Sequence, residues 1–203
     1  MGKTILLTGR PGVGKTTVIK EVLERLPGRA GGFYTAEIRE RGQRQGFKII
    51  TLDGREGILA HIDIKGPRRV SKYGVNLASL ESIGVAAIRR AIAEDDYVVI
   101  DEIGKMELFS TEFRTAVREA IASEAIVLGT ITWRPHPWAD AIKSHPQVTV
   151  LEVSRENREA MVERVLMNLL PSKGCESSPH KRIKGLSARR GEDSQGRASP
   201  FDY

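Results

Sequence analysis

A glycine-rich turn between two apolar segments is the feature that most restricts how this chain can fold. The segment before it, residues 4–8, is a continuous apolar run typical of a strand buried on both faces. The segment after it, residues 16–26, places its apolar side chains on one face of a helix. The turn, residues 9–16, matches the phosphate-loop pattern G-x-x-x-x-G-K-[ST] at every fixed position. Strand, glycine turn and helix in this order predict the beginning of an α/β nucleotide-binding fold.

The turn also carries the groups that bind phosphate. Its glycines allow successive backbone N–H groups to point into one concavity, which suits phosphate oxygens. A helix that begins at Lys15 adds the positive end of its dipole. We expect the Lys15 ammonium to reach the β- and γ-phosphates and the Thr16 hydroxyl to coordinate Mg²⁺. The nucleotide-binding residues predicted in this segment are Gly9, Arg10, Pro11, Gly12, Val13, Gly14, Lys15, Thr16 and Thr17.

A second apolar run, residues 97–100, ends in the acidic pair Asp101-Glu102. A phosphate loop needs an acid at the end of a neighbouring strand to hold the magnesium shell, and Asp101 fits this position. In one large branch of phosphate-loop enzymes, a glutamate in the position of Glu102 orients and polarises the attacking water. We therefore predict Glu102 and Lys15 as catalytic residues, and Thr16 and Asp101 as Mg²⁺ ligands.

The acidic pair also begins a pattern known from GTPases. Residues 101–104 read D-x-x-G, in which the glycine N–H meets the γ-phosphate, so Asp101, Glu102 and Gly104 join the predicted nucleotide-binding residues. The guanine-recognition motif Asn-Lys-x-Asp does not occur in the sequence. Guanine selectivity is therefore not predicted.

Other polar residues follow the predicted strands, where ligands gather in sheets of this kind. Lys105 and Arg134 are placed to supply positive charge to the transferring phosphoryl group. Thr130 or Thr132 is placed to hold the water, and Asn157-Arg158 to contact a base or ribose. For each of these residues an ordinary surface or strand-end role is an open alternative.

The remaining periodicity predicts the fold class. Residues 32–40, 45–52 and 58–64 have strand patterns joined by short turns, which require antiparallel pairing, so we expect a β-rich insertion over about 32–65. Further on, strands alternate with helices, which favours a mostly parallel, doubly wound sheet in a three-layer α/β fold. The helices are expected at residues 77–93, 110–123, 138–143 and 155–170, the strands at 97–100, 125–131 and 148–153, and a loop at 66–76.

Composition limits the domain organisation. The 203 residues suffice for one hydrophobic core, which we assign to residues 1–171, whereas 172–203 lack periodicity and are expected to be a disordered basic tail. No apolar stretch reaches the length of about 18 residues that a membrane-spanning helix needs, and the N-terminal residues do not resemble a secretory signal. The single cysteine, Cys175, excludes an intramolecular disulfide. We therefore expect a cytoplasmic protein without a membrane partner.

The net charge of +6 suggests nucleic acid as a partner, but the charge is unevenly distributed. Residues 172–203 contain seven Lys and Arg against four Asp and Glu, so half of the excess lies there. This distribution favours a nucleotide-binding enzyme with a basic tail. Binding of nucleic acid has no support in the sequence beyond that tail.

Several segments beyond the phosphate loop resemble a known family, the thermophilic nucleoside-triphosphatases, also called cancer-related nucleoside triphosphatases. The resemblance covers residues 1–170, and its most specific segment is Asp-Glu-Ile-Gly-Lys-Met-Glu-Leu at 101–108. It implies a small α/β domain that hydrolyses several nucleoside triphosphates slowly and with little base discrimination, with nucleotide-binding segments at 9–16 and 97–104. The segments that carry it are 32–39, 46–50, 72–76, 99–108 and 157–158.

Together the residues predict a phosphatase that hydrolyses Mg²⁺–NTP, with ATP and GTP among its substrates, to the diphosphate and phosphate. One alternative is a nucleotide or nucleoside kinase. Such kinases carry an arginine-rich lid, which the segment 39–44 and the pair Arg68-Arg69 could imitate, but Glu102 favours water as the acceptor because a kinase must exclude water. A second alternative is an RNA-associated module that uses NTP as a switch and the tail as an anchor.

Overall fold

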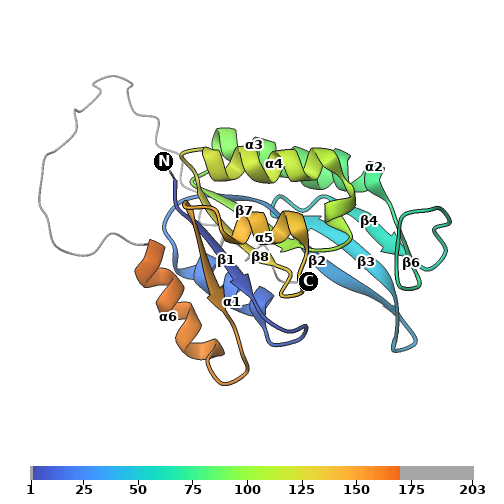
Figure 1. Cartoon of the computed structure of the whole chain (residues 1–203), viewed down its shortest axis with the longest axis horizontal. Helices are drawn as coiled ribbons and strands as arrows, with labels where there is room; N and C mark the ends of the chain where they lie inside the picture. The colour runs from blue at the N-terminus through green and yellow to red at the C-terminus, as the bar shows by residue number, and fades with distance from the viewer. Residues whose placement is uncertain (1, 170–203) are drawn as a thin grey trace, which may run out of the picture.

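A nine-stranded sheet runs through the protein (Figure 1). The computed structural model describes residues 2–169, so the predictions for Cys175 and for the tail 172–203 lie outside the described residues. The strands lie in the order β5-β6-β4-β3-β2-β7-β8-β1-β9. Their bounds are β1 Thr4–Thr8, β2 Ala30–Glu40, β3 Gln43–Thr51, β4 Glu56–His61, β5 Arg69–Val70, β6 Tyr73–Val75, β7 Tyr97–Ile103, β8 Ile126–Ile131 and β9 Val148–Glu152.

The strands β2, β7, β8, β1 and β9 form a parallel half-sheet. The predicted α/β fold with a mostly parallel core is therefore confirmed. Because the strands are parallel, their carboxyl ends meet at one edge, where the predicted site residues lie in or just after the last residues of β1, β7, β8 and β9.

The lateral order of these strands corrects one expectation. Asp101 was expected at the end of a strand that neighbours the phosphate-loop strand, but β8 lies between β1 and β7. Gly129 of β8 is in register with Leu6 on one side and Ile100 on the other. The apolar runs identify buried strands, whereas their side-by-side order depends on crossover connections that leave no local pattern.

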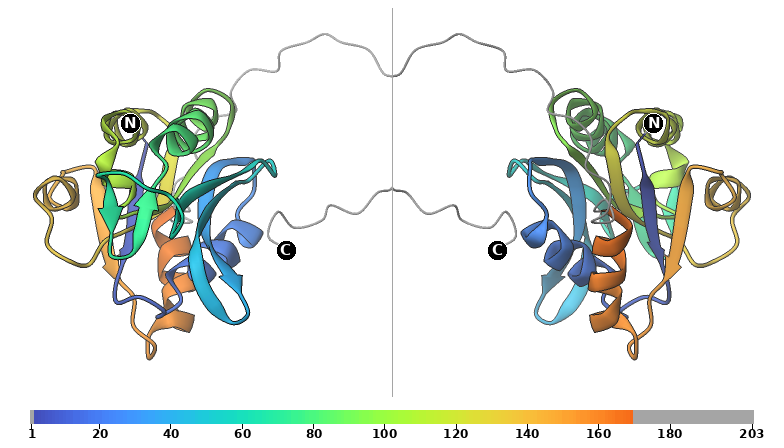
Figure 2. Two further views of the ribbon diagram at one scale, coloured as in Figure 1. Left: turned by 90° about the vertical axis from the view of Figure 1, so that its right-hand side faces the viewer. Right: turned by 90° about the vertical axis from the view of Figure 1, so that its left-hand side faces the viewer.

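The antiparallel half-sheet consists of β3, β4, β5 and β6, and it joins the parallel half through β2. The predicted antiparallel pairing is confirmed for β2 with β3 and for β3 with β4, and β2 pairs in parallel with β7 as well. The expectation of a loop over 66–76 is wrong in part, since β5 and β6 form a small hairpin there. Strands of two and three residues are too short for an alternating pattern. The side views show the sheet twisting, so that β2 and β3 lie at an angle to β1 and β9 (Figure 2).

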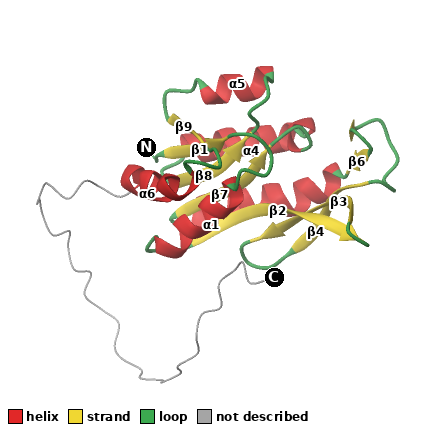
Figure 3. Ribbon diagram, turned by 90° about the horizontal axis from the view of Figure 1, so that it is seen from below, coloured by secondary structure: helices red, strands yellow, loops and turns green. Residues whose placement is uncertain are grey.

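Helices cover both faces of the parallel half (Figure 3). α1 and α6 pack on one face, and α3 and α4 pack on the other. The predicted helix 77–93 is continuous in the chain, but its middle has the wider turn of a π-helix, η1. The bounds are α1 Lys15–Arg25, α2 Leu77–Ser79, η1 Leu80–Val85, α3 Ala86–Glu94, η2 Glu107–Phe109, α4 Thr111–Ala122, α5 Pro137–Lys143 and α6 Arg158–Leu169.

Two helix starts show how local polar groups set the boundaries. The side chain of Ser110 accepts a hydrogen bond from the Phe113 N–H at 3.0 Å and so caps the start of α4. α6 begins at Arg158, later than the expected 155. The Ser154 N–H donates to Asn157 Oδ1 at 2.9 Å and the Asn157 N–H donates to Ser154 Oγ at 3.3 Å, so residues 154–157 form a cap instead of a first turn.

The core on the α4 face depends on a pair of aromatic rings. Phe113 and Phe33 are both fully buried, and their ring centroids lie 6.2 Å apart in an edge-to-face arrangement. We predict that Phe113→Ala lowers the free energy of unfolding by about 3–5 kcal/mol, because it leaves a cavity that the sheet cannot fill. Urea unfolding of the purified variant measures this loss.

The matched control is Phe109→Ala, since Phe109 is the last residue of η2, just before α4, and is 40% exposed. It should change the free energy of unfolding by less than about 1 kcal/mol. Equal losses in the two variants would contradict the assignment of Phe113 to the core.

Candidate active site

The phosphate loop connects β1 to α1 and owes its shape to three glycines. Gly9, Gly12 and Gly14 have φ values of 142°, 76° and 98°, a region that side chains disfavour. A Cβ atom on Gly9 would also lie only 2.3 Å from the Val153 carbonyl oxygen. The Lys15 ammonium reaches back over the loop and donates to the Gly9 carbonyl at 3.1 Å. The Lys15 side chain at the start of α1 thus contacts the first residue of the loop.

The other loop residues lie where the pattern places them. Thr16 and Thr17 are in the first turn of α1, with Thr16 half-buried and Thr17 exposed. The Arg10 guanidinium lies 5.8 Å from the centroid of the Trp133 ring, which follows β8. The segment after β8 thus contacts the phosphate loop.

Asp101 is buried beneath the loop at the end of β7. Its Oδ1 accepts a hydrogen bond of 2.6 Å from the Thr130 hydroxyl, while its buried Oδ2 has no hydrogen-bond partner among the described residues. Burial raises the pKa of Asp101, and the hydroxyls of Thr130 and Thr16 and the charge of Lys15 oppose this rise. An unpartnered carboxylate oxygen next to a threonine hydroxyl is the kind of ligand set that a hard cation takes.

Glu102 lines a cavity of about 230 Å³ that opens beside the phosphate loop. Burial raises the pKa of Glu102, the nearby Lys15 lowers it, and Asp101 raises it. The two predicted cations, Lys105 and Arg134, line the same cavity. The structure thus brings the acid and both cations into one space.

The two candidate threonines after β8 have different surroundings. Thr130 is fully buried and donates to Asp101, so its hydroxyl is occupied by that carboxylate. Thr132 lines the cavity with Glu102, and its hydroxyl oxygen accepts from the Arg134 N–H at 3.3 Å. The structure therefore places Thr132, rather than Thr130, beside the space where water could be held.

Sequence reasoning missed a third carboxyl group, that of Glu107. Its Oε2 accepts a hydrogen bond of 3.1 Å from the Gly104 N–H. Burial raises the pKa of Glu107 to about 8, and the neighbouring Glu102 and Asp101 raise it too. A Cβ atom on Gly104 would lie 2.9 Å from Glu107 Oε2 and 3.3 Å from the Glu102 carboxyl carbon, so both acids converge on this glycine. An acid between Met106 and Leu108, in an otherwise apolar stretch, was the available signal.

On its other side the loop borders a second cavity, of about 490 Å³. Arg158 lies against the loop at Gly14, where an added Cβ atom would lie 2.5 Å from the Arg158 Cδ atom. The Asn157 amide donates to the Glu152 carbonyl at 3.0 Å and belongs to the α6 cap, so it holds the local backbone. The cavity is lined by Arg10, Pro11, Val13, Glu152, Val153, Ser154, Arg155 and Glu156.

This arrangement defines the class of P-loop NTPases: a phosphate loop follows one parallel strand, and an acidic pair lies near the carboxyl end of another strand two positions away. The model of the NTPase family matches residues 4–166. The chain therefore belongs to the NTPase family. Among residues 2–169, no helix is long and apolar enough to span a bilayer.

Relatives of this chain are found in bacteria and archaea. Nucleoside-triphosphatase THEP1 of Thermotoga sp. (strain RQ2) is 52% identical over 170 residues, which cover 84% of this chain and 97% of the relative. The protein of the same name from Methanocaldococcus jannaschii is 42% identical over 170 residues, covering 82% of this chain and 96% of the relative. The resemblance inferred from the motifs is thus confirmed.

Two solved structures share the fold. The crystal structure of THEP1 from the hyperthermophile Aquifex aeolicus matches with a TM-score of 0.75 and 39% identity, over 82% of this chain and 98% of that one. The solution structure of a human cancer-related nucleoside triphosphatase matches with a TM-score of 0.72 and 36% identity, over 85% of this chain and 100% of that one.

The buried Glu107 generates a prediction about stability and pH. Its pKa of about 8 in the folded chain exceeds the ordinary value of 4.5, so the folded state holds an extra proton between these values. The contribution to stability is therefore present at low pH and is lost as pH rises through this window. In Glu107→Gln the side chain stays neutral at every pH. As pH rises from 5 to 8, the unfolding free energy of the variant should therefore increase relative to that of wild type by about 2–5 kcal/mol.

Urea unfolding at both pH values measures this gain. The control is Glu119→Gln, which removes a carboxylate that pairs with Arg89 on the surface. The difference in unfolding free energy between Glu119→Gln and wild type should stay nearly constant with pH. If the difference for Glu107→Gln were constant as well, the raised pKa of Glu107 would be contradicted.

Proposed function

We propose that this chain hydrolyses the β–γ phosphoanhydride bond of nucleoside triphosphates, with Glu102 as the general base. The observation that carries the proposal is the cavity beside the phosphate loop, in which the Glu102 carboxyl faces the same space as Lys105 and Arg134. A base for water and positive charge for the transferring phosphoryl group are the two requirements of this reaction.

The loop and the adjoining segments position the nucleotide. The backbone N–H groups of the loop and the Lys15 ammonium bind the phosphates, with support from the positive end of α1. The cavity of about 490 Å³ on the β9 side receives the ribose and base. Because the sequence lacks a guanine-recognition motif, we propose ATP, GTP and other NTPs as substrates, with low base selectivity.

The residues beneath the loop suit Mg²⁺. Thr16 and Asp101 would hold the ion, since the buried Oδ2 of Asp101 is without a hydrogen-bond partner among the described residues. When bound, the ion would neutralise charge on the phosphate oxygens. Thr130 keeps the Asp101 carboxylate in place through its hydrogen bond to Oδ1.

The protein's own groups carry out the proton transfer. Glu102 takes a proton from the attacking water, whose oxygen forms a bond to the γ-phosphorus as the bond from this phosphorus to the β–γ bridging oxygen breaks. The products are the nucleoside diphosphate and inorganic phosphate. Lys15, Lys105 and Arg134 stabilise the charge on the transferring group. We place this activity in the cytoplasm.

The water-activating role of Glu102 can be tested directly. Glu102→Gln should bind Mg²⁺–NTP with an affinity close to that of wild type but lose about 10²-fold or more in kcat, because the amide cannot accept the proton. Lys15→Ala should instead weaken nucleotide binding. Phosphate release from ATP, GTP, CTP and UTP, together with a direct binding assay, separates the two effects.

The same assay distinguishes hydrolysis from the kinase alternative. If Glu102→Gln turned over as fast as wild type, Glu102 would not be the base. If product appeared only after an acceptor nucleoside was added, the chain would be a kinase instead of a hydrolase.

A further inference from the structure

A basic pocket adjoins the candidate active site on the side of the antiparallel strands. It has a volume of about 790 Å³, and four cationic side chains line it, those of Arg39, Arg44, Lys72 and Arg134. None of the described residues that line it carries a carboxylate. Its volume lies in the range of about 300–1,000 Å³ that is typical of small-molecule sites. The notable feature is a concentration of positive charge in a concave space.

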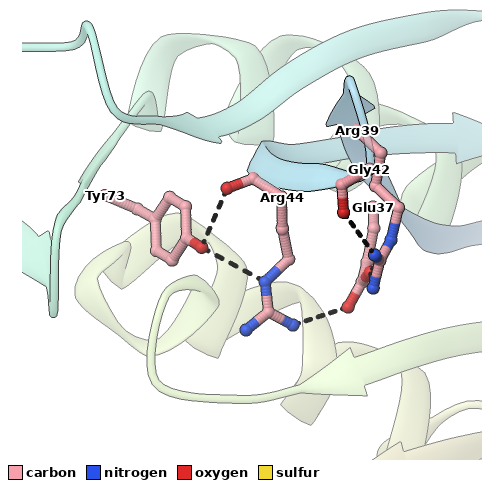
Figure 4. Close-up of polar contacts among 5 residues, drawn as sticks. All are labelled: Glu37, Arg39, Gly42, Arg44 and Tyr73. Atoms are coloured by element: carbon pink, nitrogen blue, oxygen red, sulfur yellow. Dashed lines mark hydrogen bonds and ion pairs between the residues drawn. The ribbon is translucent and has the colours of Figure 1, made fainter.

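Arg44 is held in a fixed orientation at one wall of the basic pocket (Figure 4). Its Nε–H donates to the Tyr73 hydroxyl at 3.2 Å, and that hydroxyl donates to the Arg44 carbonyl at 3.4 Å. A terminal nitrogen of the guanidinium donates to Glu37 Oε1 at 2.5 Å. Tyr73 is only 6% exposed, so a buried residue anchors this cation. A guanidinium fixed in this way loses little freedom when it binds an anion.

Glu37 holds a second arginine at the same wall (Figure 4). Arg39 donates from Nε to Glu37 Oε2 at 2.7 Å and from a terminal nitrogen to the Gly42 carbonyl at 3.1 Å. One carboxylate is thus shared by two guanidinium groups. Lys72 and Arg134 form no ion pair within residues 2–169. Arg134 is shared with the site of the transferring phosphoryl group, so Arg39, Arg44 and Lys72 together with Glu37 leave a charge of about +2 at the pocket.

The basic pocket is continuous with the cavity that contains Glu102. Pro11 of the phosphate loop, Phe47, Val70, Met106 and Arg134 line both spaces. The cavity proposed for the ribose and base lies on the opposite side of the loop. If the nucleotide binds as proposed, the basic pocket lies beyond its γ-phosphate and stays open.

We propose that the basic pocket binds a second ligand, a small organic phosphate monoester, while the phosphate loop is occupied by a nucleotide. A phosphate monoester carries a charge of about −1.5 to −2 at neutral pH, which matches the excess positive charge of the pocket. Planar guanidinium groups bind phosphate oxygens through paired hydrogen bonds. The apolar side chains of Phe47, Val70 and Met106 offer a surface for the organic part of the ester. The inference rests on the proposed function only for where the nucleotide lies.

Calorimetric titration of the full chain tests the proposal. The protein is first saturated with Mg²⁺ and the non-hydrolysable analogue AMPPNP, and then titrated with ribose 5-phosphate or with uridine 5′-monophosphate. At least one ester should bind to the wild-type complex, and ribose without phosphate should not. Arg44→Ala should weaken this binding about ten-fold or more, because a charge-assisted hydrogen bond is lost. Tyr73→Phe should weaken it less, because the charge remains but its anchor is removed.

The matched control is Lys48→Ala. Lys48 lies in the same hairpin as Arg44, but it pairs with Glu56 and does not line the pocket. The variant should bind the ester like wild type. The proposal is overturned if neither ester binds the nucleotide-loaded protein, if the ester displaces AMPPNP instead of binding beside it, or if Arg44→Ala binds like wild type. Phosphate release by Arg44→Ala without ester, expected at the wild-type rate, separates a failure here from a failure of the hydrolase proposal.

Discussion

The burial of β1 on both faces is the constraint on which the rest of the structure depends. Leu6 points into the core shared with Phe113, whereas Ile5 and Leu7 point into the core shared with Val18. A strand in this position needs a helical layer on each face. Because both of its edges are also hydrogen-bonded to neighbouring strands, the loop that follows it begins at the carboxyl edge of the sheet. The phosphate loop therefore begins at a point fixed by the packing of two layers, and its first glycine, Gly9, lies against the Val153 carbonyl.

The sequence was sufficient to predict the strands and helices whose burial is regular. β1, α1, α4 and β8 follow the predicted patterns closely because each has a long buried face. Lateral order was not predictable in the same way, since nothing in β7 or β1 indicates that β8 separates them. The hairpin of β5 and β6 was missed because its strands are very short and because only β6 joins the sheet, by pairing with β4, which is a tertiary interaction.

A similar distinction applies to the candidate site. The residues of the phosphate loop, together with Asp101 and Glu102, could be predicted because the chemistry requires them at fixed spacings within a short segment. The contact between Thr130 and Asp101 joins residues 29 positions apart and depends on which strands are neighbours. Glu107 is close to the motif in sequence, but only the folded chain shows that its carboxyl is buried against Gly104. Roles that arise from such juxtapositions have no signature in a single sequence.

The strand β2 belongs to both half-sheets and so joins the two sites in one continuous backbone. Near its middle, Tyr34 pairs with Asp101, and five residues later Arg39 pairs with Arg44, across a distance of about 17 Å. Only Phe33 and Tyr34 of β2 are paired on both edges; beyond them β2 pairs with β3 alone, with a register shift between Ile38 and Arg39. The separation between the acidic end of β7 and the arginines of the outer hairpin is therefore set by the length of a single strand.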